Sequence, residues 1–230
     1  MLGRFLELSL VTPDTGGAWQ QYQQLGFESA ATGDIWPYAY GVVTCEGLAI
    51  GLHSQGAEPL SVTFVRPEVA ALHRELTAKQ LEVEQARLGS DVFNELMLRE
   101  PGGVALRVLE ARSFSPPLHT PRRTALGSFV SISLPCNDLD EGQAFWQRLG
   151  HDSLPIAMPW DGCSIDGLPL ALHPRRILAE PALVFDHAGD VDLVAGAGIT
   201  RERTLSKLRD VPHALLRSAQ DLALLLLQQP

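Results

Sequence analysis

Cysteine is scarce in this chain. The 230 residues include three cysteines, Cys45, Cys136 and Cys163, and no two of them form a Cys-x-x-Cys pair. A disulfide framework needs a larger and even set, and zinc knuckles or dithiol redox sites need closely spaced pairs. The sequence therefore favours buried free thiols and predicts neither a zinc knuckle nor a redox site.

Long apolar runs and an excess of basic charge are also missing. The longest apolar run, Leu222 to Leu227, is far shorter than the ~20 residues of a membrane-spanning helix. Lys and Arg number 18 against 27 Asp and Glu, and the formal net charge of −9 opposes binding to a phosphate backbone or an anionic membrane surface. We expect neither a nucleic-acid partner nor a membrane partner. The first residues lack the features of a secretory signal, so we expect a cytoplasmic protein.

The balance of residues is that of a globular protein, with 45% hydrophobic and 20% charged residues. One segment breaks the pattern, because Pro116, Pro117 and Pro121 stand close together without apolar periodicity around them. We interpret residues 112–127 as a linker. It separates a predicted domain at residues 1–111 from a second at residues 128–230.

The first domain shows the same order of elements twice. Residues 4–11 alternate between apolar and polar faces as a half-buried strand does, a segment of helical spacing ends at Gly26, and short extended segments follow up to residues 48–53. A second strand at residues 60–65, a helix at residues 68–79 and further strands up to residue 110 repeat this order. The sequence therefore predicts two βαβββ modules, at residues 1–56 and 57–111.

The second domain repeats the first in letters as well as in pattern. Gly-Leu-Ala-Ile-Gly-Leu-His at residues 47–53 returns as Gly-Leu-Pro-Leu-Ala-Leu-His at residues 167–173, and Ala-Glu-Pro at residues 57–59 returns at 179–181. Tyr22 and Trp146 stand at the same distance before a Leu-Gly pair. Such self-similarity indicates duplication. It predicts modules at residues 128–178 and 179–230, the last with a weakly marked helix around residues 190–197.

A strand, a helix with an aromatic residue before Leu-Gly, and three further strands resemble the module of the vicinal oxygen chelate superfamily, which includes glyoxalases, bleomycin-resistance proteins and extradiol dioxygenases. Residues 100–103, Glu-Pro-Gly-Gly, resemble the turn before that module's last strand. The resemblance implies an α+β fold in which four βαβββ modules form two glyoxalase-like domains. Each would have a cup-shaped mixed sheet with helices outside, and the second domain would be degenerate.

The resemblance also assigns positions to the metal ligands, which project from the first and fourth strands of each module in metal-using members. In the first domain these positions fall on Glu7, Gly51, Ser61 and Arg107. Glu7 alone is an ordinary ligand, and the Arg107 guanidinium has no lone pair to offer a cation. We therefore expect no metal and no other cofactor. In the second domain the matching positions, such as Ala171 and Leu225, are mostly apolar.

Strand parity places a set of polar side chains in the first cup, where we predict a small-molecule site. The set is Glu7, Ser9, His53, Ser61, Thr63 and Arg107. We expect Glu7 and Arg107 to form a charge-assisted pair or Arg107 to receive a ligand's carboxylate, and a purely structural ion pair is the alternative. Glu7 and His53 are candidates for acid–base catalysis. A structural role for His53 remains open, because its counterpart His173 lies in the degenerate copy.

Aromatic residues provide candidate walls for the same cup. Trp36, Tyr38 and Tyr40 precede or enter the third strand, and Phe93 lies with Glu95 and Met97 on a strand whose parity the sequence leaves open. Pockets for planar molecules are mainly apolar with a few polar groups, although these side chains also fit a core or an interface.

Two classes of function follow. One is a binding protein of the bleomycin-resistance type that holds a small, partly apolar molecule without a metal. The alternative is a lyase, isomerase or ring-cleaving dioxygenase relative that uses Glu7 or His53 for acid–base chemistry. A chain with four modules can pair them internally, so both a monomer and a homodimer are compatible with the sequence.

The ligand positions generate a first prediction. Purified protein is expected to contain no stoichiometric Zn, Ni, Fe or Mn, because only one of the four first-domain positions carries an ordinary metal ligand. Elemental analysis of the purified chain measures this. Near-equimolar metal that is lost on Glu7→Gln substitution would contradict it.

Overall fold

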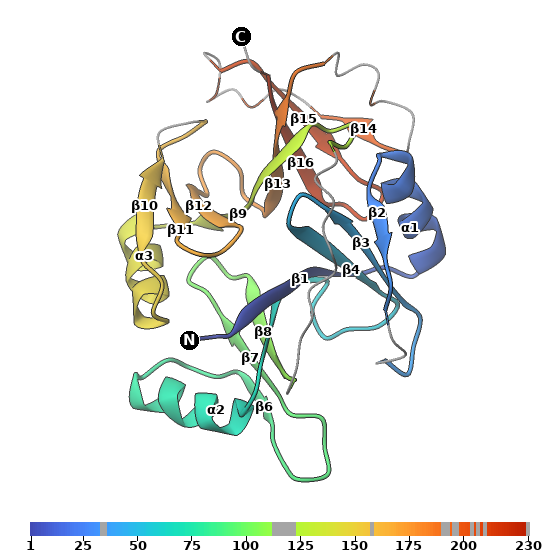
Figure 1. Cartoon of the computed structure of the whole chain (residues 1–230). Coiled ribbons are helices and arrows are strands. Elements are labelled where there is room, and N and C mark those ends of the chain that lie inside the picture. Colours follow the sequence, from blue (N-terminus) through green and yellow to red (C-terminus); the bar gives the residue numbers. More distant parts are fainter. Residues whose placement is uncertain are drawn as a thin grey trace.

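The chain is described by a computed structural model at residues 1–32, 36–111, 123–156, 159–189, 194, 198–202, 205, 208 and 211–228. Within these residues, two eight-stranded mixed sheets form the framework and three helices accompany them (Figure 1). This is the predicted α+β architecture. Most of the predicted helix around residues 190–197 and most of the predicted linker lie outside the described residues.

The first sheet is built from the first half of the chain. Its strands follow one another in space in the order β2-β3-β4-β1-β5-β8-β7-β6. The elements are β1 (Arg4–Val11), α1 (Thr15–Gln24), β2 (Glu28–Ala30), β3 (Tyr40–Cys45), β4 (Leu48–His53), β5 (Leu60–Arg66), α2 (Val69–Ala78), β6 (Gln85–Arg87), β7 (Glu95–Arg99) and β8 (Ala105–Glu110). Each module contributes one half of the sheet, and the two halves join where β1 pairs antiparallel with β5.

The second sheet repeats this arrangement in the order β10-β11-β12-β9-β13-β16-β15-β14. Its elements are β9 (Ser128–Cys136), α3 (Leu139–Arg148), β10 (Ser153–Ile156), β11 (Gly162–Ile165), β12 (Leu170–Pro174), β13 (Ala182–His187), β14 (Thr200–Arg201), β15 (His213–Arg217) and β16 (Ala223–Gln228). The strand order therefore confirms the duplication that the sequence predicts.

Helix ends follow local sequence chemistry. The Asp14 carboxylate accepts a 2.8 Å hydrogen bond from the Gly17 amide at the start of α1, and Asp138 caps α3 in the same way. Gly26 and Gly150 follow these helices with φ of +92° and +82°, which glycine adopts without a side-chain clash. The aromatic residues Tyr22 and Trp146 are fully buried against their sheets.

The central strand of each sheet carries an irregularity at the same point. Pairing of β1 with β5 shifts between Phe5 and Glu7, and pairing of β9 with β13 shifts at the matching place in the second half. A bulge of this kind re-aims the side chains beside it. The two sheets are therefore alike in their irregular positions as well as in their regular ones.

The two copies differ at two positions that lie next to each other in space, those of Glu7 and Gly51. Ser9 pairs with Gly51 in the first sheet, and Ser133 pairs with Ala171 in the second, so Gly51 corresponds to Ala171. A methyl group on Gly51 would overlap the Glu7 carboxylate. In the second half the position of Glu7 is Ser131, whose shorter side chain leaves room for the Ala171 methyl.

The two halves pack against each other. The Ala125 amide donates a 2.7 Å hydrogen bond to the Leu25 carbonyl at the end of α1, and the Phe129 amide donates a 2.6 Å bond to Glu46. Apolar side chains of both sheets form one continuous buried cluster. Among the described residues, no helix is long and apolar enough to span a membrane.

The Glu7 and Gly51 positions generate a second prediction. Gly51→Ala is expected to destabilise the protein by about 1–3 kcal/mol, because the added methyl overpacks the space of the Glu7 carboxylate. Glu7→Ser combined with Gly51→Ala reproduces the pair of the second half and is expected to cost less than the sum of the two single changes. Chemical denaturation measures all three free energies of unfolding. Additive losses would show that the two positions are not coupled.

Candidate functional site

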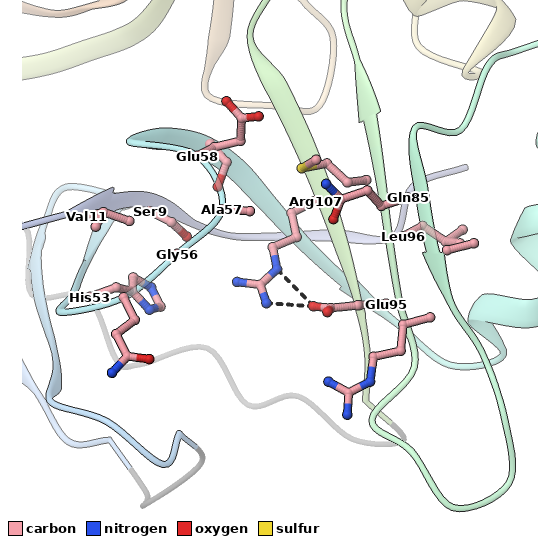
Figure 2. A pocket seen from close by; sticks show the side chains of 15 residues that line it. Ser9, Val11, His53, Gly56, Ala57, Glu58, Gln85, Glu95, Leu96 and Arg107 are labelled. Carbon is pink, nitrogen blue, oxygen red and sulfur yellow. Dashed lines mark hydrogen bonds and ion pairs between the residues drawn. The ribbon is translucent and has the colours of Figure 1, made fainter.

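One cavity among the described residues lies in the first half, inside its cup-shaped sheet. Its volume is about 260 Å³, and β1, β4, β5, β6, β7, β8 and the loop after β4 line it (Figure 2). Its polar wall includes Ser9, His53, Ser61, Glu95 and Arg107, and Met97 and Leu96 add apolar surface. Four of the six side chains grouped by strand parity, Ser9, His53, Ser61 and Arg107, line this cavity, and Glu7 and Thr63 lie behind it within hydrogen-bond distance of the Ser9 hydroxyl.

Glu7 is the most constrained polar group of the site. Its side chain is buried, and its Oε1 atom accepts hydrogen bonds from the Ser9 hydroxyl at 2.8 Å and from His53 Nε2 at 2.7 Å. Its Oε2 atom accepts a 2.6 Å bond from the Tyr40 hydroxyl. Burial first, and then the neighbouring Glu7 charge, raise the pKa of the Tyr40 phenol well above its ordinary value. Tyr40 therefore remains a hydrogen-bond donor to the carboxylate.

His53 links the buried carboxylate to a tyrosine nearer the solvent. The ring is buried, with its Nε2 atom against Glu7, and its Nδ1 atom lies 3.2 Å from the Tyr38 hydroxyl. When Nε2 carries the proton that bonds Glu7, Nδ1 is an acceptor and the Tyr38 hydroxyl donates to it. Burial raises the pKa of Tyr38, and the Arg107 charge and hydrogen bond oppose that increase.

Arg107 bonds a different carboxylate from the one expected. Its Nη2 and Nε atoms lie 2.6 and 3.2 Å from Glu95 Oε2 (Figure 2). The predicted pair between Glu7 and Arg107 is therefore wrong, because a closer acid on the neighbouring strand β7 takes the guanidinium. The side chains of Arg107 and Glu95 remain 22% and 27% exposed, which leaves the pair accessible from the cavity.

The predicted aromatic residues gather around Arg107 and His53. The Trp36 ring lies 4.9 Å from the Arg107 guanidinium carbon, stacks on Tyr38 at 5.5 Å between centroids, and meets Phe93 edge to face at 5.9 Å. Phe93 precedes strand β7 instead of lying within it and is 50% exposed. Trp36, Tyr38 and Phe93, together with Tyr40, thus form one cluster of four predicted residues beside the cavity.

The donor set at the superfamily's four ligand positions does not fit a divalent metal. Gly51 has no side chain, Ser61 offers a neutral hydroxyl and Arg107 is a cation, while the Glu7 oxygens already accept three hydrogen bonds. In the described part of the chain, no group of three or more His, Cys, Asp or Glu side chains could hold a metal ion. The chemistry available at this site is hydrogen bonding, charge and proton transfer by its own residues.

In the second half the matching space is filled. Leu225 pairs with Val184 as Arg107 pairs with Thr63, and it belongs to a buried apolar cluster with Trp160, Leu178 and Leu215. His173 corresponds to His53, but it bonds Ser133 and the Leu178 carbonyl, and burial lowers its pKa to about 4. It is therefore a neutral core residue without a carboxylate partner.

Some cavity residues are absent from the sequence prediction. Gln85 and Arg87 enter the wall from β6, and Gln55 and Glu58 enter from the loop after β4. A three-residue strand and an irregular loop carry no alternation from which the sequence could assign a face. The pairing of β6 with β7, in which Gln85 lies opposite Met97, brings Gln85 and Arg87 to the cavity wall.

Comparisons with known proteins support the fold. No family model and no curated protein matches the sequence. Among solved structures, catechol 2,3-dioxygenase is similar at a TM-score of 0.59 and 15% identity, over 98% of this chain and 92% of that one. An extradiol ring-cleaving dioxygenase from B. fuscum is similar at 0.60 and 12%, over 99% and 72%.

A third match is homoprotocatechuate 2,3-dioxygenase from Brevibacterium fuscum in complex with 3,4-dihydroxyphenylacetate, at a TM-score of 0.59 and 13% identity, over 99% of this chain and 80% of that one. Extradiol dioxygenases are members of the vicinal oxygen chelate superfamily. Identities this low establish the fold and leave the activity to the site itself. The chain is a two-domain protein with the vicinal oxygen chelate fold.

Proposed function

We propose that the first half binds a small aromatic molecule that carries an anionic group, without a metal. The observation that carries the proposal is the contrast between the two copies. One cup holds a cavity of about 260 Å³ with an accessible arginine, and the corresponding space of the other copy is packed with leucine and tryptophan side chains.

The chemistry of the wall favours an anion at Arg107. Guanidinium has five N–H donors, and Glu95 uses two of them through one oxygen. A ligand carboxylate can take remaining donors or replace Glu95, since a partly exposed pair is worth only about 1 kcal/mol or less. Trp36 and Phe93 provide flat apolar surface next to the charge. One structural neighbour binds an aryl carboxylate, 3,4-dihydroxyphenylacetate, which supports this ligand class.

Ring cleavage is supported less well. The oxygen chemistry of metal-dependent relatives needs a Lewis acid, and the residues at the four ligand positions are unsuited to hold one. Binding therefore ranks first, and proton transfer by the site's own side chains is the enzymatic alternative that retains support.

A binding experiment gives the third prediction. Phenyllactate is the probe, and its methyl ester is the matched neutral ligand. Arg107→Met is expected to weaken phenyllactate binding by about 1.5–3 kcal/mol, the range for hydrogen bonds to charged groups, and to leave the ester nearly unaffected. Isothermal titration calorimetry measures both affinities. Equal weakening of acid and ester would mean that Arg107 shapes the cavity without recognising charge.

The fourth prediction concerns a substitution that is expected to strengthen phenyllactate binding. Glu95→Gln removes the carboxylate that competes for Arg107, so phenyllactate is expected to bind about fivefold more tightly, the equivalent of about 1 kcal/mol for a partly exposed pair. Glu84→Gln is the control, because Glu84 pairs with Arg99 and lies outside the cavity wall. Unchanged or weaker binding in Glu95→Gln would argue against an anion at Arg107.

A further inference from the structure

The site contains a chain of hydrogen bonds that ends on Tyr38. Both Glu7 oxygens accept bonds from within the protein, and both His53 ring nitrogens are engaged, one by Glu7 and one by Tyr38. The sequence suggests Glu7 or His53 as the acid–base group, but neither has a free atom to offer a ligand. Tyr38 is the outermost member, since it is only partly buried.

This geometry has the logic of a catalytic triad. A buried carboxylate fixes the ring tautomer of a histidine, whose other nitrogen then accepts the proton of a hydroxyl group. Here the order is Glu7, His53, Tyr38, at 2.7 and 3.2 Å. Burial raises the pKa of the Tyr38 phenol, and the charge of Arg107 and its hydrogen bond to the phenol offset part of that increase. Arg107 and His53 both line the cavity, and the Tyr38 phenol lies beside its wall, 3.2 Å from His53 Nδ1.

The second copy lacks this relay. His173 packs against Trp160 at 4.9 Å and 42°, much as His53 packs against Tyr40 at 4.6 Å and 42°. Its Nδ1 atom contacts the Ser133 hydroxyl, and its Nε2 atom contacts a backbone carbonyl instead of a carboxylate. Support of the histidine ring therefore does not require Glu7 or a tyrosine. The carboxylate and the phenol together are extra features of the first copy.

We propose that Tyr38 is a catalytic acid–base group that moves one proton between two atoms of an aromatic 2-oxo acid, with His53 and Glu7 as the relay behind it. This rests on the proposed binding of an aryl anion in the first cup. Arg107 would hold the ligand carboxylate, and the carbonyl makes the neighbouring C–H acidic. Such a keto–enol exchange needs no oxidant, reductant or other reactant.

The step balances in protons and electrons. Tyr38 takes the proton of the carbon next to the carbonyl while its own hydroxyl proton passes to His53 Nδ1. The C–H electron pair becomes the new C=C bond, and the carbonyl pair moves to oxygen to give an enolate. Glu7 stabilises the imidazolium. Tyr38 then delivers its proton to the enolate oxygen or back to carbon, and His53 returns a proton to Tyr38.

The test, our fifth prediction, uses phenylpyruvate with the whole chain in deuterium oxide, where proton NMR follows loss of the C3 proton signal. Wild-type protein is expected to accelerate this exchange above the protein-free rate. Tyr38→Phe is expected to lower kcat by about 100-fold, within the range for general acid–base catalysis, with little change in KM. Tyr22→Phe is the control, because Tyr22 lies in the core.

Phenyllactate separates this inference from the proposed function, because it has the carboxylate and the ring but no ketone group at C2. It is expected to compete with phenylpyruvate and to show no exchange. If phenyllactate binds and phenylpyruvate is not exchanged, binding stands and the relay is overturned. If Tyr38→Phe keeps the wild-type kcat, Tyr38 is not the acid–base group. Failure of both compounds to bind overturns the ligand class and the relay together.

Discussion

The burial of the Glu7 carboxylate is the constraint on which the first cup depends. An ionised carboxylate taken out of water costs several kcal/mol unless its lone pairs are satisfied. Three donors from three strands do this, Ser9 on β1, Tyr40 on β3 and His53 on β4. The carboxylate in turn fixes the position of each donor, so one buried charge orients these three side chains of the site. Gly51 provides the space that the charge occupies.

The two copies share one framework, which carries the buried carboxylate in the first copy and lacks it in the second. In the second copy Ser131 replaces the carboxylate, a methyl occupies the released space, and leucine stands where Arg107 would be. Apolar packing then fills the cup. An apolar core stabilises the fold with ordinary burial, whereas the first copy maintains a buried charge, an accessible cation and open volume. That cost is expected where a protein retains a function.

Much of the fold was predictable because it depends on periodicity. Alternation assigned residues 4–11 and 60–65 to strands, and the repeated letters at residues 47–53 and 167–173 revealed the duplication. Strand parity also brought Ser9, His53 and Arg107 to one cavity. The partners of the charges were not predictable. The sequence pattern allows both Glu7 and Glu95 to reach the cup. The pairing of β7 with β8 places Met97 opposite Arg107, and Glu95 lies two residues from Met97 on the same strand. The relay through Tyr38 depends on side-chain rotamers that no sequence period encodes.

The contact between the two halves links ligand binding in the first cup to the stability of the second half. Leu2, Leu52, Leu126 and Leu134 belong to a single buried cluster that crosses from one sheet to the other. Backbone bonds from residues 125 and 129 to the first half add to it. Opening either half would expose apolar surface of its neighbour, so we expect the two halves to unfold together. A molecule bound only in the first cup is therefore expected to protect the distant amides of β15 and β16 against solvent exchange by the same free energy.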